Sequence, residues 1–267
     1  MLLIGYILTL LMGLSLGLIG GGGSILTVPI LVYFFSIDPL MATSESLFIV
    51  GTTALIGGIF SYMNKEVKIL TAFKFALSSF IGVFIMKKYL LPTIPLVLYQ
   101  TDKFTFTKSM MTMSLFAGLM LIVSIKMIRT KSKRIVDNDS NKNNQLKISS
   151  QGFIVGNLTG LIGAGGGFLI VPALVNLMGL NMRQAIGSSL LIIAANSLFG
   201  FTIAITNGLT PDWSVLILIL SISIFGLFLG RFFSKKISDE NLKKGFGYFV
   251  LIIGSIILVD QILKIIN

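Results

Sequence analysis

Two glycine-rich runs carry the clearest chemical signal in this sequence. The first, Gly20–Gly23, is followed by Ser24, and the second, Gly163–Gly167, contains only Ala164 besides glycine. Glycine is the poorest helix former apart from proline, so each run should end one helix and begin another. The backbone N–H groups at a helix start are unpaired and partly positive, and glycine lets a ligand approach them closely. Two such starts predict a binding site for an anion.

Hydroxyl and amide side chains follow each run and are suited to hydrogen-bond the oxygen atoms of an anion. The predicted substrate-binding residues are Gly21, Gly22, Gly23, Ser24, Ser46, Gly165, Gly166, Gly167, Ser188, Ser189 and Asn196. One alternative is that the hydroxyls bond back to their own helices. Another is that glycines at Gly-x-x-x-Gly spacing, such as Gly13/Gly17 and Gly156/Gly160, pack helices together, although packing accounts poorly for four consecutive glycines.

Glu45 is the one acidic residue early in a predicted membrane-spanning segment. Ionisable side chains within a membrane are costly and often belong to proton relays, so Glu45 is a candidate for proton coupling. The alternative is a position at the outer membrane interface, which we expect for Asp38.

The composition excludes several classes of protein. The 267 residues are 54% hydrophobic and only 12% charged, and they include no Cys and no His. Disulfide scaffolds, Cys/His metal sites and Ser-His or Cys-His catalysis are therefore excluded, and we expect no enzymatic activity, no catalytic residue, no metal and no cofactor. The net charge of +11 does not indicate nucleic-acid binding, because the Lys and Arg residues lie in short clusters between long apolar runs. These features predict an all-α polytopic membrane protein.

A transmembrane helix needs roughly 20 apolar residues. Six stretches meet this requirement, at residues 40–62, 69–91, 109–128, 183–206, 214–231 and 245–263. The two glycine-broken segments differ from them, because each consists of two helical pieces, which are 2–19 with 24–37 and 150–162 with 168–178. The last two pieces would reach only about 20 and 17 Å, too short to cross. We therefore predict two re-entrant helical hairpins.

The sequence contains an internal duplication at a shift of 143 residues. Eleven of the 16 residues from 17 to 32 recur between 160 and 175, and the register continues through Ser46/Ser189 and Gly57/Gly200. Between the copies lies a polar segment that lacks the apolar residues to fold alone. We predict a first transmembrane repeat over 1–128, a cytoplasmic linker over 129–149 and a second transmembrane repeat over 150–267.

The positive charges distinguish two topologies. If both glycine-broken segments crossed the membrane, the 21 Lys and Arg residues would divide almost evenly between its two sides. If both are hairpins that return to their own side, about three-quarters of these residues lie on the side of the linker, as expected of the cytoplasmic side. The second topology is favoured, with the linker inside and both termini outside. Three crossings per repeat then make the two repeats inverted, which is common in secondary transporters.

The paired motifs carry a family resemblance. Gly17-x-x-Gly20-Gly21-Gly22-Gly23 with Val28-Pro29 is mirrored by Gly160-x-x-Gly163-x-Gly165-Gly166-Gly167 with Val171-Pro172, and Ala42-Thr43-x-x-Ser46-Leu47 is mirrored by Ala185-Ile186-Gly187-Ser188-Ser189. This pattern resembles the TauE/SafE sulfite exporter family, also called the toluene sulfonate uptake permease family.

The resemblance implies a permease of the bacterial inner membrane that moves a small sulfur-containing oxyanion, such as sulfite or an organosulfonate, with proton coupling. Its partners would be the anion and the lipid bilayer, with no nucleic acid, and a homo-oligomer is also considered. The substrate is expected at the paired glycine breaks near the membrane midplane. A passive anion channel with the same pore is the alternative function.

Overall fold

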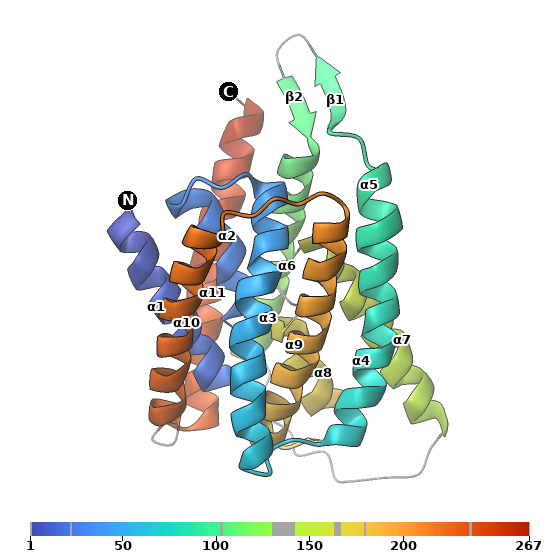
Figure 1. Ribbon diagram of the computed structural model, residues 1–267, viewed down its shortest axis with the longest axis vertical. Coiled ribbons are helices and arrows are strands. Elements are labelled where there is room, and N and C mark those ends of the chain that lie inside the picture. Colours follow the sequence, from blue (N-terminus) through green and yellow to red (C-terminus); the bar gives the residue numbers. More distant parts are fainter. Residues whose placement is uncertain are drawn as a thin grey trace.

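The computed structural model describes residues 2–21, 23–101, 104–129, 142–162, 167–178, 180–234 and 237–266. It is a bundle of long helices with one short antiparallel β-hairpin (Figure 1). The elements in chain order are α1 (Leu2–Ile19), α2 (Ser24–Phe34), α3 (Pro39–Met63), α4 (Ile69–Phe84), the π-helix η1 (Ile85–Leu90), α5 (Leu91–Thr93), β1 (Val97–Thr101), β2 (Phe104–Thr107), α6 (Lys108–Arg129), α7 (Lys142–Ile162), α8 (Gly167–Met178), α9 (Met182–Thr206), α10 (Trp213–Ser234) and α11 (Asp239–Ile266).

Six helical segments of the described chain are long and apolar enough to cross a membrane, which confirms the prediction of a polytopic helical protein. They are Leu2–Ile19, Pro39–Met63, Ile69–Thr93, Lys108–Lys126, Met182–Thr206 and Trp213–Ser234. Five coincide with predicted spans. The predicted span 245–263 lies within α11, whose apolar part, Val250–Leu263, is shorter than the other six. Leu2–Ile19, predicted as one arm of a hairpin, reaches the length of a spanning helix by itself.

Two ends of the bundle are distinguished by the connections between helices. The β end is where β1 and β2 project, and the opposite end is where α3 turns into α4 (Figure 1). Helix α1 runs inward from the side of the β end and α2 returns toward that end, whereas α7 runs inward from the opposite end and α8 returns toward it. Both termini lie toward the β end.

Helix α2 lies in the interior of the bundle. Every residue from Ser24 to Leu31 is buried, whereas the outer helices expose large apolar side chains such as Leu70 and Phe225. Exposed apolar side chains of this kind are suited to contact lipid, because a bilayer core is as apolar as they are. An apolar helix with no exposed face must instead be surrounded by other helices, and here α1, α3 and α8 contact α2.

Four pairs of long helices make the most extensive contacts, namely α1 with α10, α4 with α7, α3 with α9 and α6 with α11. Glycines allow the first two pairs to approach through their backbones. A Cβ on Gly13 would lie 2.1 Å from the carbonyl oxygen of Ser223, and a Cβ on Gly156 would lie 2.1 Å from that of Ser79. The alternative interpretation of the Gly-x-x-x-Gly spacings, as helix-packing motifs, is therefore confirmed for these glycines.

Two features differ from the expected elements. Helix α7 begins at Lys142, inside the segment 129–149 that was predicted as a linker. Residues 142–149 contain Lys, Gln and Leu and no Pro or Gly, so they can continue the apolar helix outward at little cost. The β-hairpin was not predicted, although its Val, Tyr, Phe and Thr residues favour strands.

Candidate functional site

The two glycine-rich breaks meet inside the bundle. A Cβ on Gly21 would lie 2.0 Å from the carbonyl oxygen of Gly167, and a Cβ on Gly167 would lie 2.8 Å from the Cα of Gly21. The backbones at these two predicted residues are therefore in direct contact, although 146 positions separate them in the chain. The predicted residues Gly22, Gly165 and Gly166 lie outside the described residues.

The first break is built so that only glycine fits. Gly20 has a φ of +82°, in the left-handed region that side chains disfavour. A Cβ on Gly23 would lie 2.2 Å from the carbonyl oxygen of Met12 in α1. Gly23 also occupies the N-cap of α2, where none of the described side chains makes a capping hydrogen bond. Such a helix start leaves backbone N–H groups for another acceptor, which is the local chemistry that the sequence predicted.

Helix α9 passes beside both breaks. The side chain of Ile186 lies against Gly20, and that of Ile193 lies against Gly167. Ser24 was predicted to bind substrate, but its hydroxyl donates to the carbonyl oxygen of Gly21 at 2.8 Å. This hydrogen bond holds the chain where it turns into α2.

Two buried hydroxyls outside the predicted set of site residues have no hydrogen-bond partner among the described residues. They are Thr27 Oγ1 and Ser197 Oγ. Thr27 lies on α2 one helical turn after Ser24, and Ser197 lies on α9 one turn after Ile193. Buried polar groups are normally paired, so each of these hydroxyls has capacity to bind a ligand. Their spacing from the glycine runs was the only signal in the sequence that could have identified them.

The hydroxyls of Ser46 and Ser189 are buried and bond to their own helices. Ser46 Oγ donates to the carbonyl oxygen of Thr43 at 3.0 Å, and Ser189 Oγ donates to that of Ile186 at 2.8 Å. The alternative that hydroxyls bond back to the helix is therefore observed for both. Ser188 instead accepts a hydrogen bond from the backbone N–H of Lys68 at 2.9 Å, which attaches α9 to the residue before α4.

Asn196 joins two helices. Its side-chain amide and the hydroxyl of Ser79 on α4 are within hydrogen-bond distance at 2.7 and 2.9 Å, with both residues fully buried. A matching contact joins α3 to α10, where the hydroxyls of Thr53 and Ser223 lie 3.0 Å apart. Asn196 was predicted to bind substrate, but in this conformation its side-chain amide is hydrogen-bonded to Ser79.

Glu45 is buried, with 3% of its surface exposed, and its Oε2 has no hydrogen-bond partner within the described part of the chain. Its carboxylate interacts with the backbone of Asp212, which precedes α10 at the β end. Asp38 is exposed and caps α3 by accepting from the backbone N–H of Leu40 at 2.8 Å. The two acids therefore differ in environment, and Glu45 lies inside the protein at this end.

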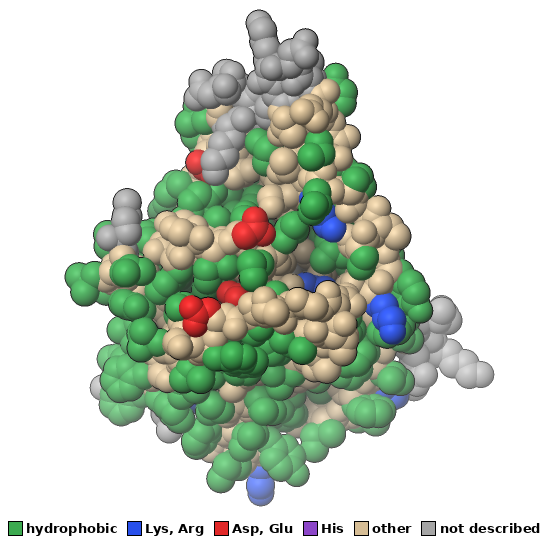
Figure 2. All heavy atoms as spheres, turned by 45° about the horizontal axis from the view of Figure 1, so that its top comes forward, with side chains coloured by type: hydrophobic (Ala, Val, Ile, Leu, Met, Phe, Trp, Pro, Cys, Tyr) green, Lys and Arg blue, Asp and Glu red, His purple; other side chains and the backbone are tan. Residues whose placement is uncertain are grey.

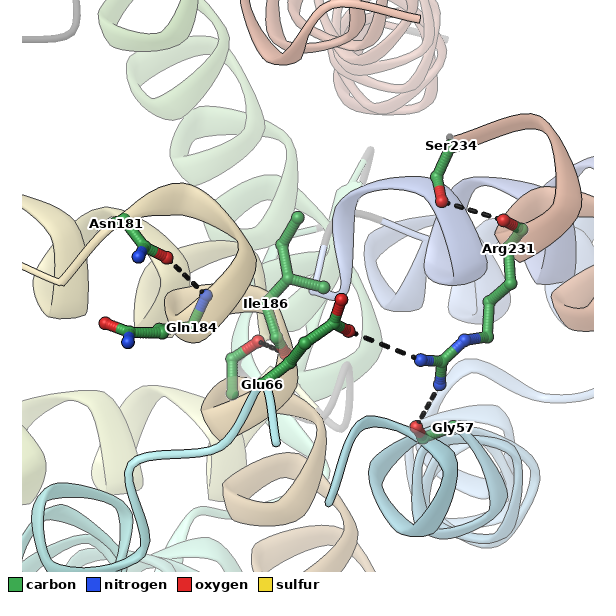
Figure 3. A network of polar contacts seen from close by, with 8 residues as sticks. Gly57, Glu66, Asn181, Gln184, Ile186, Arg231 and Ser234 are labelled. Carbon is green, nitrogen blue, oxygen red and sulfur yellow. Dashed lines mark hydrogen bonds and ion pairs between the residues drawn. The ribbon is translucent and has the colours of Figure 1, made fainter. Parts of the chain in front are cut away.

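An ion pair connects the two halves of the chain at the opposite end. Arg231 on α10 and Glu66, in the loop after α3, approach to 3.6 Å (Figure 3). The guanidinium of Arg231 also donates to the carbonyl oxygen of Gly57 on α3. Ile186, which lies against Gly20, is beside this network in Figure 3. These contacts tie α3 to α10 close to the first glycine break.

The sequence as a whole identifies the family of the chain. Residues 6–257 match the family model described as "Sulfite exporter TauE/SafE". The chain belongs to the TauE/SafE sulfite exporter family. The resemblance inferred from the paired glycine motifs is thus confirmed, and the chain is a multi-pass membrane transporter.

Several curated proteins are similar to this TauE/SafE chain along most of their length. A "Probable membrane transporter protein" of Xylella fastidiosa (strain Temecula1) is 29% identical over 90% of this chain and 88% of its own. A protein of Haemophilus influenzae with the same name is 28% identical, covering 91% and 92%. "Probable membrane transporter protein YunE" of Bacillus subtilis is 24% identical, covering 96% and 98%. No solved structure matches the chain.

Proposed function

We propose that this TauE/SafE protein is a secondary transporter of a small sulfur-containing oxyanion, such as sulfite or an organosulfonate. The observation that carries the proposal is the contact between Gly21 and Gly167, which joins the starts of α2 and α8 inside the bundle. Two helix N-termini offer backbone N–H groups and partial positive charge to one anion. The hydroxyls of Thr27 and Ser197, which have no partner among the described residues, supply further donors.

We also propose that α1–α2 and α7–α8 are re-entrant hairpins of two inverted repeats. The contacts between helices support this division, because they come in exchanged pairs. Helix α1, which begins the first hairpin, packs against α10 of the second half. Helix α7, which begins the second hairpin, packs against α4 of the first half, and α4 and α10 hold equivalent places in their halves. The remaining extensive contacts join equivalent helices, α3 with α9 and α6 with α11. A two-fold axis relating the halves would generate this set of pairs.

Individual residues support the same symmetry. Thr53 and Asn196 differ by the repeat shift of 143, and their partners, Ser223 and Ser79, lie on the equivalent helices α10 and α4. The hydrogen bond between α3 and α10 therefore has its counterpart between α9 and α4. The proposed repeats are 1–128 and 150–267, joined by the linker 129–149.

The proposed mechanism is alternating access, in which the two halves rock around the glycine breaks and expose the anion to one side of the membrane at a time. Glu45 is the proposed proton carrier, because it is buried and has a carboxylate oxygen without a hydrogen-bond partner among the described residues. We place the protein in the bacterial inner membrane with the linker in the cytoplasm and both termini outside, as the distribution of Lys and Arg favours.

Reconstitution into proteoliposomes tests the function. Uptake of labelled sulfite or labelled ethanesulfonate is measured with and without a pH gradient, and with and without the same unlabelled anion inside. A proton-coupled secondary transporter responds to the gradient and is accelerated by internal substrate. Uptake that follows only the electrochemical gradient of the anion, without acceleration by internal substrate, would identify a channel. Failure to move either anion would contradict the proposed substrate class.

A further inference from the structure

Lys87 is a buried cation that the glycine site does not include. It lies on η1 with 2% of its surface exposed, and its Nζ donates to the hydroxyl of Ser44 at 3.0 Å. Within the described chain, no carboxylate oxygen lies within 4.0 Å of this Nζ. An ammonium has three donor hydrogens, and a buried charge without a counter-charge is strongly unfavourable. A position this costly inside a membrane protein indicates a functional role.

A second cation adds to the positive charge around Lys87. Lys108, at the start of α6, is close enough to interact with Lys87 electrostatically. The Nζ of Lys108 donates to the carbonyl oxygens of Leu91 and Ile94, which brings it to the end of the helix that carries Lys87. Lys87 itself lies in the π-helical turn η1, a geometry that is frequent at functional sites. Figure 2, which brings this end forward, shows basic and acidic side chains around a hollow in the surface.

Arg231 is the counterpart of Lys87 in the other half. Ser79 and Gly82 of α4 correspond to Ser223 and Gly226 of α10, at a shift of 144, and the same register pairs Lys87 with Arg231. The correspondence holds in the packing, because a Cβ on Gly82 would meet the backbone of α7 and one on Gly226 would meet the backbone of α1. Each half thus places one cation at the end of its equivalent helix, and the two cations lie at opposite ends of the bundle.

The two cations differ in their partners. Arg231 is 3.6 Å from the Glu66 carboxylate, which neutralises it (Figure 3). Lys87 interacts with a hydroxyl and a second cation, and no carboxylate oxygen of the described residues lies within 4.0 Å of its Nζ. Arg231 therefore has a counter-charge within the protein, whereas Lys87 has none at ion-pair distance among the described residues, which leaves it able to pair with an anionic ligand.

We infer that Lys87, with Ser44 and Lys108, forms an anion-binding site at the β end that receives the transported oxyanion before it reaches the glycine breaks. The inference rests on the proposed function, because the same anion occupies both sites in turn. Two ammonium groups attract an oxyanion and exclude cations, and the hydroxyl of Ser44 adds a neutral donor when Lys87 turns to the ligand. By the proposed topology this site faces the outside of the cell.

The test uses the full-length protein in proteoliposomes with labelled sulfite supplied at the β end. Lys87→Met removes the charge at similar volume, and Lys87→Arg keeps it. Lys88→Met is the matched control, because Lys88 is the next residue of η1 but is exposed, with its Nζ 5.5 Å from the centre of the Phe84 ring. Loss of a charge-assisted hydrogen bond predicts a KM for sulfite roughly 10- to 100-fold higher in Lys87→Met. Lys87→Arg and Lys88→Met should keep the KM of the wild type.

Direct binding gives an independent measurement. Trp213 is the single Trp of the chain and lies at the β end, with its ring 5.5 Å from that of Phe48. Its fluorescence should report sulfite binding to the detergent-solubilised protein, with the affinity lost in Lys87→Met and kept in Lys88→Met. The melting temperature separates binding from folding. Removing an uncompensated buried charge should leave it unchanged or raise it, whereas a structural lysine would lower it.

The outcomes distinguish this inference from the function on which it rests. Wild-type uptake with equal KM values in Lys87→Met and Lys88→Met would overturn the anion site and leave the transporter proposal intact. A lowered melting temperature together with lost uptake in Lys87→Met would make Lys87 structural and also overturn the site. No uptake of sulfite or ethanesulfonate by the wild type would contradict the proposed function itself.

Discussion

Substituting Gly21 with Ala introduces a methyl group where the two breaks touch. The new Cβ would lie 2.0 Å from the carbonyl oxygen of Gly167 and 2.3 Å from its carbonyl carbon. Real Cβ atoms essentially never approach another heavy atom within 3.0 Å, so the two backbones would have to separate by about 1 Å. Overpacking of this kind costs about 1–3 kcal/mol. Because the displaced atoms are backbone, rotation of a side chain cannot relieve the contact.

Gly118→Ala is the matched control for this substitution. Gly118 lies within α6, and a Cβ there would meet no described atom within 4 Å. Ala is the better helix former by up to about 1 kcal/mol, so this variant should be as stable as the wild type or slightly more stable. We expect Gly21→Ala to lose sulfite uptake in proteoliposomes and to unfold at lower temperature in detergent, and Gly118→Ala to do neither. Wild-type uptake and stability in Gly21→Ala would refute the direct contact between the breaks.

Three further predictions concern coupling and symmetry. Glu45→Gln should transport sulfite without responding to a pH gradient, measured as uptake with and without the gradient, and an unchanged response would remove Glu45 from the mechanism. Asn196→Leu and Thr53→Val each remove one of the two equivalent interhelical hydrogen bonds. Both should lower thermal stability by a similar amount, roughly 1 kcal/mol, and a loss confined to one of them would contradict their equivalence. Gly13→Ala and Gly156→Ala should destabilise the protein about equally, because each Cβ would lie 2.1 Å from a carbonyl oxygen.

The helical membrane architecture could be predicted from the sequence because it depends on local properties. Apolar length marked five of the six candidate spanning helices, and helix propensity placed the breaks at the glycine runs. The β-hairpin and the outward extension of α7 were not predicted. Both lie outside the long apolar stretches, where length and hydropathy give no signal.

The contacts within the site could not be predicted in the same way, because they join residues far apart in the chain. Asn196 was predicted as a substrate-binding amide, but its partner Ser79 lies 117 positions away, and nothing local to either residue pairs them. The contact of Gly21 with Gly167 likewise depends on how the two hairpins pack. The sequence could indicate which residues need partners, and the packing of the helices decides which partners they have.

Lys87 shows a different limit of prediction from the sequence. It stands beside Lys88 at the end of an apolar stretch, so counting charges by loop assigned both lysines to the outer side of the membrane. The side chains of neighbouring helical residues differ by about 100° in direction. Here the side chain of Lys87 is buried, whereas that of Lys88 is exposed. Composition alone does not distinguish a charge that orients the protein from a charge that binds an anion.

The central claim, that both sides of the membrane gain access in turn to the glycine breaks, is tested most directly by the reactivity of a single cysteine at Thr27. The chain contains no Cys, so Thr27→Cys provides one thiol without background. A membrane-impermeant thiol reagent is added outside the proteoliposomes or enclosed within them and then removed, and labelled sulfite exchange is measured. The account predicts that either treatment inactivates Thr27→Cys and leaves the cysteine-free wild type active. Inactivation from one side only, or from neither side, would contradict alternating access at this position.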